Sequence, residues 1–274
     1  MSPLKQFLTA SGAAMLIAAC GPASPDSDGA SNPERPFELT QGETEISGRT
    51  ADGVDYFGTL YFGGLPTEAP LIHLFHQGGS NGRGEYAPLT GWLNENGYRA
   101  IAWDLRSGGD LFGENNRTVD SLGDADDGFC AAYAEVEDIA KLSSSLAGNA
   151  PVIVWGSSYS GALVFQAAAK YSEKIDAVIA FSPASGGPLA DCRARDYLAG
   201  LQAPALVLRP ASEMERESSL EQRDIFESAG VEFLVIENGV HGSSMLVDER
   251  TENDMSEPRA SVLQWLDAQT GKGN

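Results

Sequence analysis

Basic residues, histidines and cysteines are all scarce in this chain of 274 residues. Its 18 Lys and Arg are outnumbered by 39 Asp and Glu, which gives a formal net charge of -21 at pH 7. That charge repels nucleic acid, so nucleic acid is not expected as a partner. There are only three His and three Cys, and no group of residues has the spacing of metal ligands. We therefore expect neither a metal nor any other cofactor.

A long hydrophobic run is missing as well, because the apolar stretch over residues 7–19 is too short to span a bilayer. A lysine precedes it and small residues end it, which is typical of an export signal. The segment Ile17-Ala18-Ala19-Cys20 resembles the lipobox of bacterial lipoproteins, in which the cysteine is acylated. That resemblance implies a signal peptide at residues 1–19 and a membrane anchor through a lipid on Cys20. An ordinary secretory signal is the alternative.

Gly21, not Asp, follows Cys20, and by the sorting habit of bacterial lipoproteins this points to the outer membrane. We therefore expect an exported protein that is lipid-anchored in the bacterial cell envelope and faces the periplasm. Residues 20–36 are rich in Pro, Ser, Gly and Asp and hold no large apolar side chain, so they are expected to be a disordered tether. Residues 37–274 then form one folded domain.

Two thiols remain once Cys20 is assigned to lipid. Cys130 and Cys192 belong to a chain expected to be exported, and paired thiols oxidise outside the cytoplasm. A disulfide between them is one interpretation, and two separate buried cysteines are the other. Both stay open, because pairing by elimination carries no geometric information.

Short β-rich runs alternate with helical patterns beyond residue 37. This order predicts an α/β fold with a mainly parallel eight-stranded sheet that is covered by helices on both faces. Strands are expected at residues 45–49, 54–62, 70–75, 98–104, 151–155, 175–181, 205–208 and 231–236. Helices are expected at residues 86–96, 131–146, 158–171, 218–229 and 257–268. Only one short helix fits between residues 181 and 205, so we expect a minimal cap or none.

The segment Gly156-Ser157-Ser158-Tyr159-Ser160-Gly161 joins an expected strand to an expected helix. A serine at the apex of such a turn stands clear of the backbone, and small neighbours allow the turn to be tight. We therefore predict that Ser158 is a nucleophile. The segment departs from Gly-x-Ser-x-Gly, because Ser160 replaces the second glycine and Gly161 follows it. A purely structural turn is the alternative.

The base that deprotonates such a serine is expected in the loop after the last strand. His73 lies within an expected strand, and His76 lies at the end of the same strand. The remaining histidine, His241, follows the strand at residues 231–236. We predict that His241 is the general base.

The imidazole in turn needs a carboxylate that sets its tautomer and stabilises its charged form. Glu213 comes soon after the strand at residues 205–208 and gives the chain order serine, acid, histidine. We predict that Glu213 has this role. The alternatives are Glu215, Glu217 and Asp191.

Two backbone N–H groups should stabilise the oxyanion of a tetrahedral intermediate. One is expected from Tyr159, directly after the nucleophile. The other is expected from the loop after the strand at residues 70–75, from Gly78 or, as second choice, from Gln77. His76 resembles the histidine of the His-Gly oxyanion motif, and that resemblance implies a structural role.

The turn at Ser158, the order of Ser158, Glu213 and His241, and the oxyanion loop together resemble the α/β-hydrolase superfamily over residues 45–268. Within it, the chain is similar to small, lidless dienelactone-hydrolase-like proteins and to bacterial exported esterases. The segment Asp104-Leu105-Arg106-Ser107-Gly108 is similar to the Asp-x-Arg-Gly turn of that family. Dienelactone hydrolases use a cysteine nucleophile, so their substrate does not carry over.

The resemblance implies a serine hydrolase that cleaves small-molecule or polymer carboxylic esters through an acyl-enzyme. A serine peptidase of the same fold is one alternative. A catalytically idle binding or scaffold lipoprotein is another, because a hydrolase fold does not by itself entail activity.

Overall fold

The computed structural model describes residues 43–123 and 128–272. These residues lie within the compact unit Leu39–Asn274. The expected signal peptide, Cys20 and the tether fall outside the described residues, as does the expected start of the domain at residue 37. No helix within the described ranges combines the length and the apolar character that a bilayer crossing requires.

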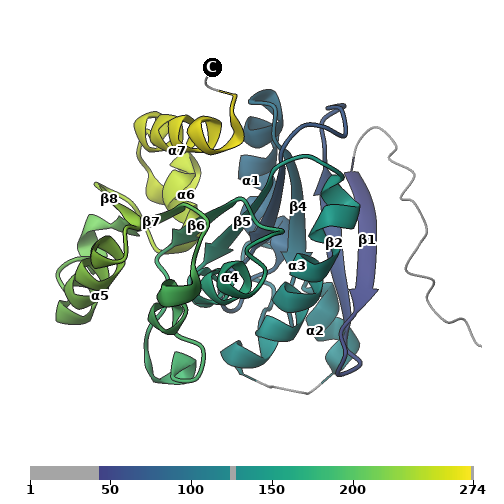
Figure 1. Cartoon of the computed structure of the whole chain (residues 1–274), viewed down its shortest axis with the longest axis horizontal. Helices are drawn as coiled ribbons and strands as arrows, with labels where there is room; N and C mark the ends of the chain where they lie inside the picture. The colour runs from purple at the N-terminus through teal and green to yellow at the C-terminus, as the bar shows by residue number, and fades with distance from the viewer. Residues whose placement is uncertain (1–42, 124–127, 273–274) are drawn as a thin grey trace, which may run out of the picture. The chain divides into compact units, whose positions relative to one another are not determined.

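The described residues form one eight-stranded sheet in the order β1-β2-β4-β3-β5-β6-β7-β8 (Figure 1). β1 (Glu43–Arg49) and β2 (Asp55–Tyr61) make an antiparallel hairpin, and β2 also pairs antiparallel with β4 (Arg99–Asp104). All the other neighbours run parallel. The remaining strands are β3 (Leu71–Phe75), β5 (Val152–Ser157), β6 (Ala177–Phe181), β7 (Ala205–Pro210) and β8 (Glu232–Ile236). The predicted fold is therefore confirmed.

Helices cover both faces of the sheet, because its central strands carry apolar side chains on both sides. Ile153 and Trp155 of β5 belong to one core, and Val152 and Val154 belong to the other. α1 (Gly82–Glu95) and α7 (Ser256–Thr270) contribute to the first core. α3 (Tyr133–Ala147), α4 (Tyr159–Lys170) and α5 (Glu217–Ser228) contribute to the second. The sheet is thus held between two helix layers (Figure 1).

The sequence does not predict several short elements. These are the helices α2 (Arg117–Leu122) and α6 (Asp248–Thr251) and a number of 3-10 turns. Between β6 and β7, three such turns replace the single short helix that the sequence indicates: Gly187–Leu189, Ala194–Asp196 and Leu198–Gly200. Elements of three to six residues are too short to show a periodic apolar pattern.

The carboxyl ends of the parallel strands meet at one edge of the sheet, where ligands bind in open α/β folds. Ser158 follows β5, Glu213 follows β7 and His241 follows β8. The loop with Gly78 follows β3. The parallel order thus gathers the predicted site residues at the same edge.

Candidate active site

Ser158 is the residue at which β5 turns into α4. Its backbone has φ 58° and ψ -117°, a region that non-glycine residues rarely occupy. Gly156 permits the turn, because a Cβ atom there would lie 2.5 Å from the carbonyl oxygen of Ser160. The N–H of Ser158 donates to Phe181 at 2.8 Å, and its carbonyl accepts from Ala184 at 3.0 Å. The strained apex is thus held by the segment after β6, and its side chain is partly exposed.

Ser160 stands where the usual motif has its second glycine, and its side chain makes hydrogen bonds that a glycine could not make. It is fully buried, its hydroxyl donates to the carbonyl of Phe75 at 2.7 Å, and it accepts the N–H of Ser157 at 2.9 Å. Ser160 therefore links β5 to β3. Ser157 is buried too, and its Oγ accepts the N–H of Ser243 at 3.0 Å. Of the three serines in the turn, only Ser158 is open to a substrate.

His241 and Glu213 come together above the edge of the sheet. The Nδ1 atom of His241 lies 2.5 Å from Oε1 of Glu213. Because a carboxylate only accepts hydrogen bonds, Nδ1 carries the proton and Nε2 is left as the basic nitrogen. The His241 side chain is 51% exposed and that of Glu213 is 8% exposed. The carboxylate is thus shielded, while the imidazole can reach a substrate.

Arg209 holds Glu213 from the other side. Its guanidinium pairs with Oε2 of Glu213, donates to the carbonyl of Pro183 at 2.5 Å and also bonds Gln222. Burial raises the pKa of Glu213, but His241, through its hydrogen bond and charge, and the charge of Arg209 outweigh burial and lower this pKa below its ordinary value. Glu213 is therefore ionised. The sequence gives no signal for Arg209, which lies in an otherwise apolar strand.

The backbone N–H groups of Tyr159 and Gly78 make no hydrogen bond among the described residues. Tyr159 is the first residue of α4, and a helix N-terminus favours negative charge. The Tyr159 ring stacks on Phe129 with 4.8 Å between ring centroids. A Cβ atom at Gly78 would lie 3.0 Å from the same Phe129 ring. Phe129 thus packs both segments together.

Gln77 is removed as an oxyanion donor, because its N–H donates to Oε2 of Glu85 at 2.7 Å. Glu85 is fully buried on the first turn of α1, directly behind the loop. Burial raises the pKa of Glu85 to about 7, against the opposing effects of the Ser157 hydroxyl, the Gln77 N–H and the Arg250 charge. The sequence does not indicate this contact, since an acid in the first turn of a helix is ordinary.

The other two histidines are structural. His76 Nδ1 lies 2.8 Å from the carbonyl of Gln77, and Nε2 accepts the N–H of Leu105 at 2.8 Å. His73 Nδ1 accepts the indole N–H of Trp103 at 3.0 Å. Both histidines are fully buried, and burial lowers the pKa of each. In the part of the chain that the structure describes, no group of three or more His, Cys, Asp or Glu is placed to hold a metal ion.

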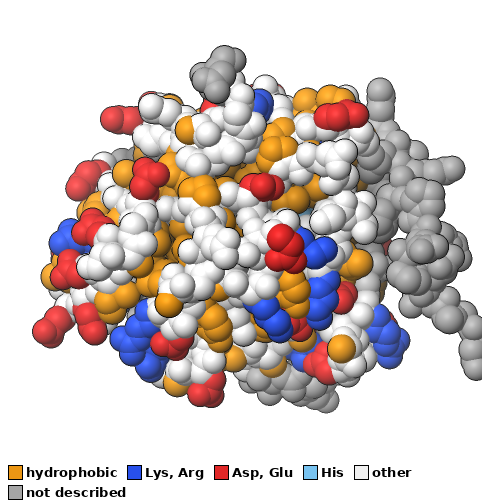
Figure 2. All heavy atoms as spheres, in the orientation of Figure 1, with side chains coloured by type: hydrophobic (Ala, Val, Ile, Leu, Met, Phe, Trp, Pro, Cys, Tyr) orange, Lys and Arg blue, Asp and Glu red, His pale blue; other side chains and the backbone are white. Residues whose placement is uncertain are grey.

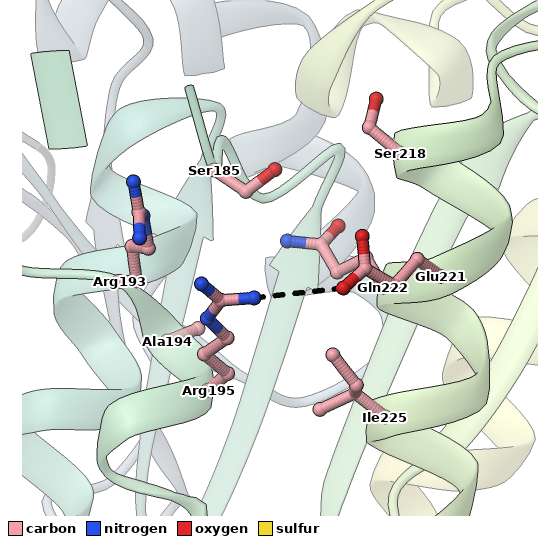
Figure 3. Close-up of a pocket in the computed structure, with 8 residues that line it drawn as sticks. All are labelled: Ser185, Arg193, Ala194, Arg195, Ser218, Glu221, Gln222 and Ile225. Atoms are coloured by element: carbon pink, nitrogen blue, oxygen red, sulfur yellow. Dashed lines mark ion pairs between the residues drawn. The ribbon is translucent and has the colours of Figure 1, made fainter. Parts of the chain in front are cut away.

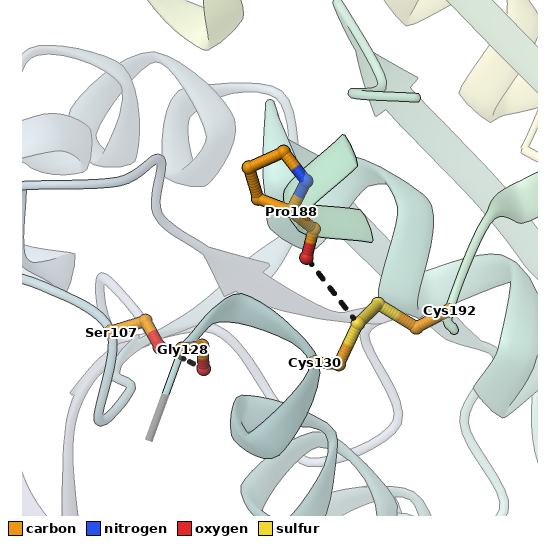
Figure 4. The surroundings of a disulfide bond; sticks show 5 residues. All are labelled: Ser107, Gly128, Cys130, Pro188 and Cys192. Atoms are coloured by element: carbon orange, nitrogen blue, oxygen red, sulfur yellow. Dashed lines mark hydrogen bonds between the residues drawn. A yellow bond between two sulfur atoms is a disulfide. The ribbon is translucent and has the colours of Figure 1, made fainter. Parts of the chain in front are cut away.

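A cleft of about 540 Å³ opens beside the oxyanion loop and is lined in part by Gly79, Arg106, Phe129 and Pro188. A disulfide between Cys130 and Cys192 ties two segments of its wall together (Figure 4). Cys130 Sγ also lies 3.7 Å from the carbonyl oxygen of Pro188. The disulfide therefore fixes Phe129, and with it the packing of the oxyanion loop.

One protein family matches this chain. The family model described as serine aminopeptidase, S33, matches residues 68–229, which is more than half of the sequence. The match includes Ser158 and Glu213 and ends before His241. No curated protein matches the chain.

Solved structures with the same fold come from several organisms. A carboxyl esterase from Bacillus coagulans is 11% identical, with a TM-score of 0.62 over 84% of this chain and 100% of that one. A dienelactone hydrolase from Anabaena variabilis is 18% identical, with a TM-score of 0.55 over 83% and 95%. A serine hydrolase without a lid from Xanthomonas campestris is 14% identical, with a TM-score of 0.55 over 77% and 92%. These structures share the α/β-hydrolase fold, and the family match shows that the chain belongs to the serine aminopeptidase S33 family.

Proposed function

We propose that this protein hydrolyses carboxylic esters, with Ser158 as nucleophile, His241 as general base and Glu213 as the acid. One observation carries the proposal: the 2.5 Å hydrogen bond between Glu213 and His241 lies at the sheet edge where Ser158 forms a strained, partly exposed apex. Such strain persists only where the surrounding structure imposes it, which is typical of functional sites.

The reaction follows from the proton positions. Nε2 of His241 takes the proton of Ser158 as Oγ attacks the ester carbonyl, and Glu213 stabilises the resulting imidazolium. The N–H groups of Tyr159 and Gly78 stabilise the oxyanion. His241 then gives its proton to the departing alcohol, and the acyl group stays on Ser158. In the second half, His241 deprotonates a water that releases the acid and restores the serine.

The cleft beside the oxyanion loop favours esters over peptides. An aminopeptidase binds a free amino terminus, whose charge needs a carboxylate or several acceptors once it is buried. The described residues that line this cleft include no Asp or Glu. A small ester, or the exposed ester end of a polymer, fits an open cleft with apolar walls at Phe129 and Pro188.

Labelling with a fluorophosphonate tests the nucleophile, because this reagent reacts with activated serines. We expect the folded protein to be labelled and Ser158→Ala to be unlabelled. Ser212→Ala, at an exposed serine beside Glu213, is the matched control and should keep the label. If wild type is not labelled, or if Ser158→Ala is labelled equally, the chain is not a serine hydrolase of this kind. Such a result favours the alternative, a catalytically idle binding or scaffold protein.

Turnover separates esterase from peptidase. We expect short acyl nitrophenyl esters to be cleaved with a kcat/KM well above that for aminoacyl nitroanilides of matched size. A higher kcat/KM for the aminoacyl amides overturns the ester assignment and leaves the Ser158 chemistry intact. The physical difference is the leaving group, since an amine must be protonated as it departs and an aryl alcohol need not be.

We also propose that the protein is exported and held in the cell envelope by a lipid on Cys20. The Cys130–Cys192 disulfide supports export, because disulfides persist in oxidising compartments. Metabolic labelling with an alkyne fatty acid should mark the full-length protein, and Cys20→Ala should lose the mark and leave the membrane fraction. An unmarked wild type in the soluble periplasmic fraction supports the ordinary secretory signal instead.

A further inference from the structure

A second pocket lies beside the candidate site, between the segment after β6 and helix α5 (Figure 3). Its volume is about 190 Å³. Its polar lining is Ser185, Arg193, Arg195, Ser218, Glu221 and Gln222. Polar side chains from two separate segments thus converge on one small space.

The pocket is joined to the proposed active site by short backbone links. Ser185 follows Ala184, whose N–H donates to the carbonyl of Ser158 at 3.0 Å. Gln222 donates to the carbonyl of Pro183 at 3.1 Å and also bonds Arg209, the residue that holds Glu213. The pocket therefore adjoins the segments that hold Ser158 and Glu213.

Arg193 is the unusual residue of this pocket. Its Nε is buried without a hydrogen-bond partner, and no ion pair or hydrogen bond involves its guanidinium among the described residues. Arg83, Arg209 and Arg223 also have a buried Nε without a hydrogen bond, yet each has an acid within 4.0 Å. Acids are not in short supply, since Asp and Glu outnumber Lys and Arg by 39 to 18 and are scattered over the face in Figure 2. Arg193 is therefore a cation that lacks its anion.

The side chains that line this pocket carry a net positive charge. Arg193 directly follows Cys192, which the disulfide ties to Cys130. Arg195 lies 3.8 Å from Glu221, across the pocket (Figure 3). Glu221 thus offsets one of the two arginines and leaves one positive charge, which matches one carboxylate. A guanidinium is also the side chain best shaped to bind a carboxylate.

We propose that this pocket binds a carboxylate on the substrate, so that the preferred esters are monoanionic half-esters of dicarboxylic acids. The inference rests on the proposed ester hydrolysis at Ser158. Arg193 donates to the carboxylate, and the hydroxyls of Ser185 and Ser218 supply further donors. The local charge also offsets the repulsion that a chain of net charge -21 exerts on an anionic substrate.

The test compares nitrophenyl half-esters of succinate, glutarate and adipate with the same compounds capped as neutral methyl esters. We expect wild type to prefer the anionic member for at least one chain length. Arg193→Ala should lower kcat/KM for that anionic ester by about tenfold or more, the scale of a charge-assisted hydrogen bond, and change the neutral ester by less than about twofold. Arg193→Lys should restore part of the preference.

Arg223→Ala is the matched control, because it removes one arginine of α5 that pairs with Asp224 and Glu227 outside the pocket. It should leave the ratio of anionic to neutral kcat/KM unchanged. An equal fall for both esters in Arg193→Ala, or no fall for either, overturns the carboxylate pocket. Failure of wild type to cleave the neutral esters, with no fluorophosphonate label on Ser158, instead overturns the ester hydrolysis itself.

Discussion

Two buried glutamates flank the turn at Ser158, and their surroundings differ. Glu213, after β7, touches the guanidinium of Arg209 and the imidazole of His241, so its pKa lies below the ordinary value. Glu85, in α1, accepts the backbone N–H of Gln77, and burial raises its pKa to about 7.

The difference lies in the group that the nearest arginine binds. Arg209 bonds the carboxylate of Glu213 directly, whereas Arg250 donates to the backbone carbonyls of Gly84 and Glu85 at 2.7 and 2.8 Å. The proposed reaction needs a fixed negative charge beside the imidazolium. It does not need one beside the loop that receives the oxyanion, because like charges repel. The same residue type therefore has a lowered pKa on one side of the site and a raised pKa on the other.

The largest effect is expected on the charged side, from His241→Gln. Without a base at this position the serine is not deprotonated, so kcat for a short ester should fall by about 10⁴-fold or more. The free energy of unfolding should change little, because the His241 side chain is 51% exposed. Steady-state kinetics and thermal unfolding measure the two quantities. If kcat of the variant stays within about tenfold of wild type, His241 is not the general base.

Glu213→Gln should come next. Glutamine keeps the shape and offers Arg209 an oxygen, but its amide cannot stabilise the imidazolium and favours the wrong tautomer of His241. We expect kcat to fall by about 10³ to 10⁴-fold. Glu215→Gln, at the nearby exposed acid, is the control and should retain wild-type kcat. If the two variants behave alike, Glu213 is not the acid.

The sequence predicts which residues reach the edge of the sheet where Ser158 lies. Ser158, Glu213 and His241 follow parallel strands, and parallel strands end at one edge, so chain order alone brings them to that edge. The eight strands are predictable for a similar reason, because buried runs such as β3 and β5 are continuous and apolar.

Chain order does not specify the contacts of Arg209 and Glu85, or the lack of a partner for Arg193. Arg209 bonds Glu213, Glu85 accepts the N–H of Gln77, and the guanidinium of Arg193 has no partner in the part of the chain that the structure describes. The exclusion of Gln77 as an oxyanion donor has the same origin. It depends on the direction in which α1 leaves the loop, which no residue pattern in the loop encodes.

The Cys130–Cys192 disulfide joins the segment of Phe129, beside the Gly78 loop, to the segment after β6. It closes a loop across a sequence separation of 62 residues, so replacing both cysteines with alanine should lower the free energy of unfolding by about 2 to 4 kcal/mol. Denaturant unfolding with and without dithiothreitol measures this. Reductant should destabilise wild type and leave the double variant unchanged. If dithiothreitol lowers the free energy of unfolding equally in both proteins, the disulfide is not the source of that stability.

The smallest effect concerns the pH dependence of Glu85. Its pKa in the folded protein, about 7, lies above its ordinary value of 4.5. The folded state therefore binds this proton more tightly than the unfolded state, and the stability it contributes is present below pH 4.5 and is lost as the pH rises through 7. Glu85→Gln keeps an acceptor for the Gln77 N–H but cannot ionise. Stability lost between about pH 5 and 8 should thus be smaller in the variant by about 1 to 3 kcal/mol.

Urea unfolding at a series of pH values measures that difference. Some pH dependence should remain in Glu85→Gln, because burial also raises the pKa of Glu135 to about 7. Arg106 pairs with both Asp52 and Glu135 at 2.7 Å. Glu135→Gln removes the buried one of these two partners and should destabilise the protein at every pH. The contrast between the variants separates a carboxyl group that is simply buried from one that is buried and paired. Parallel stability curves for wild type and Glu85→Gln mean that Glu85 stays ionised, and the contrast between the two sides of the site then fails.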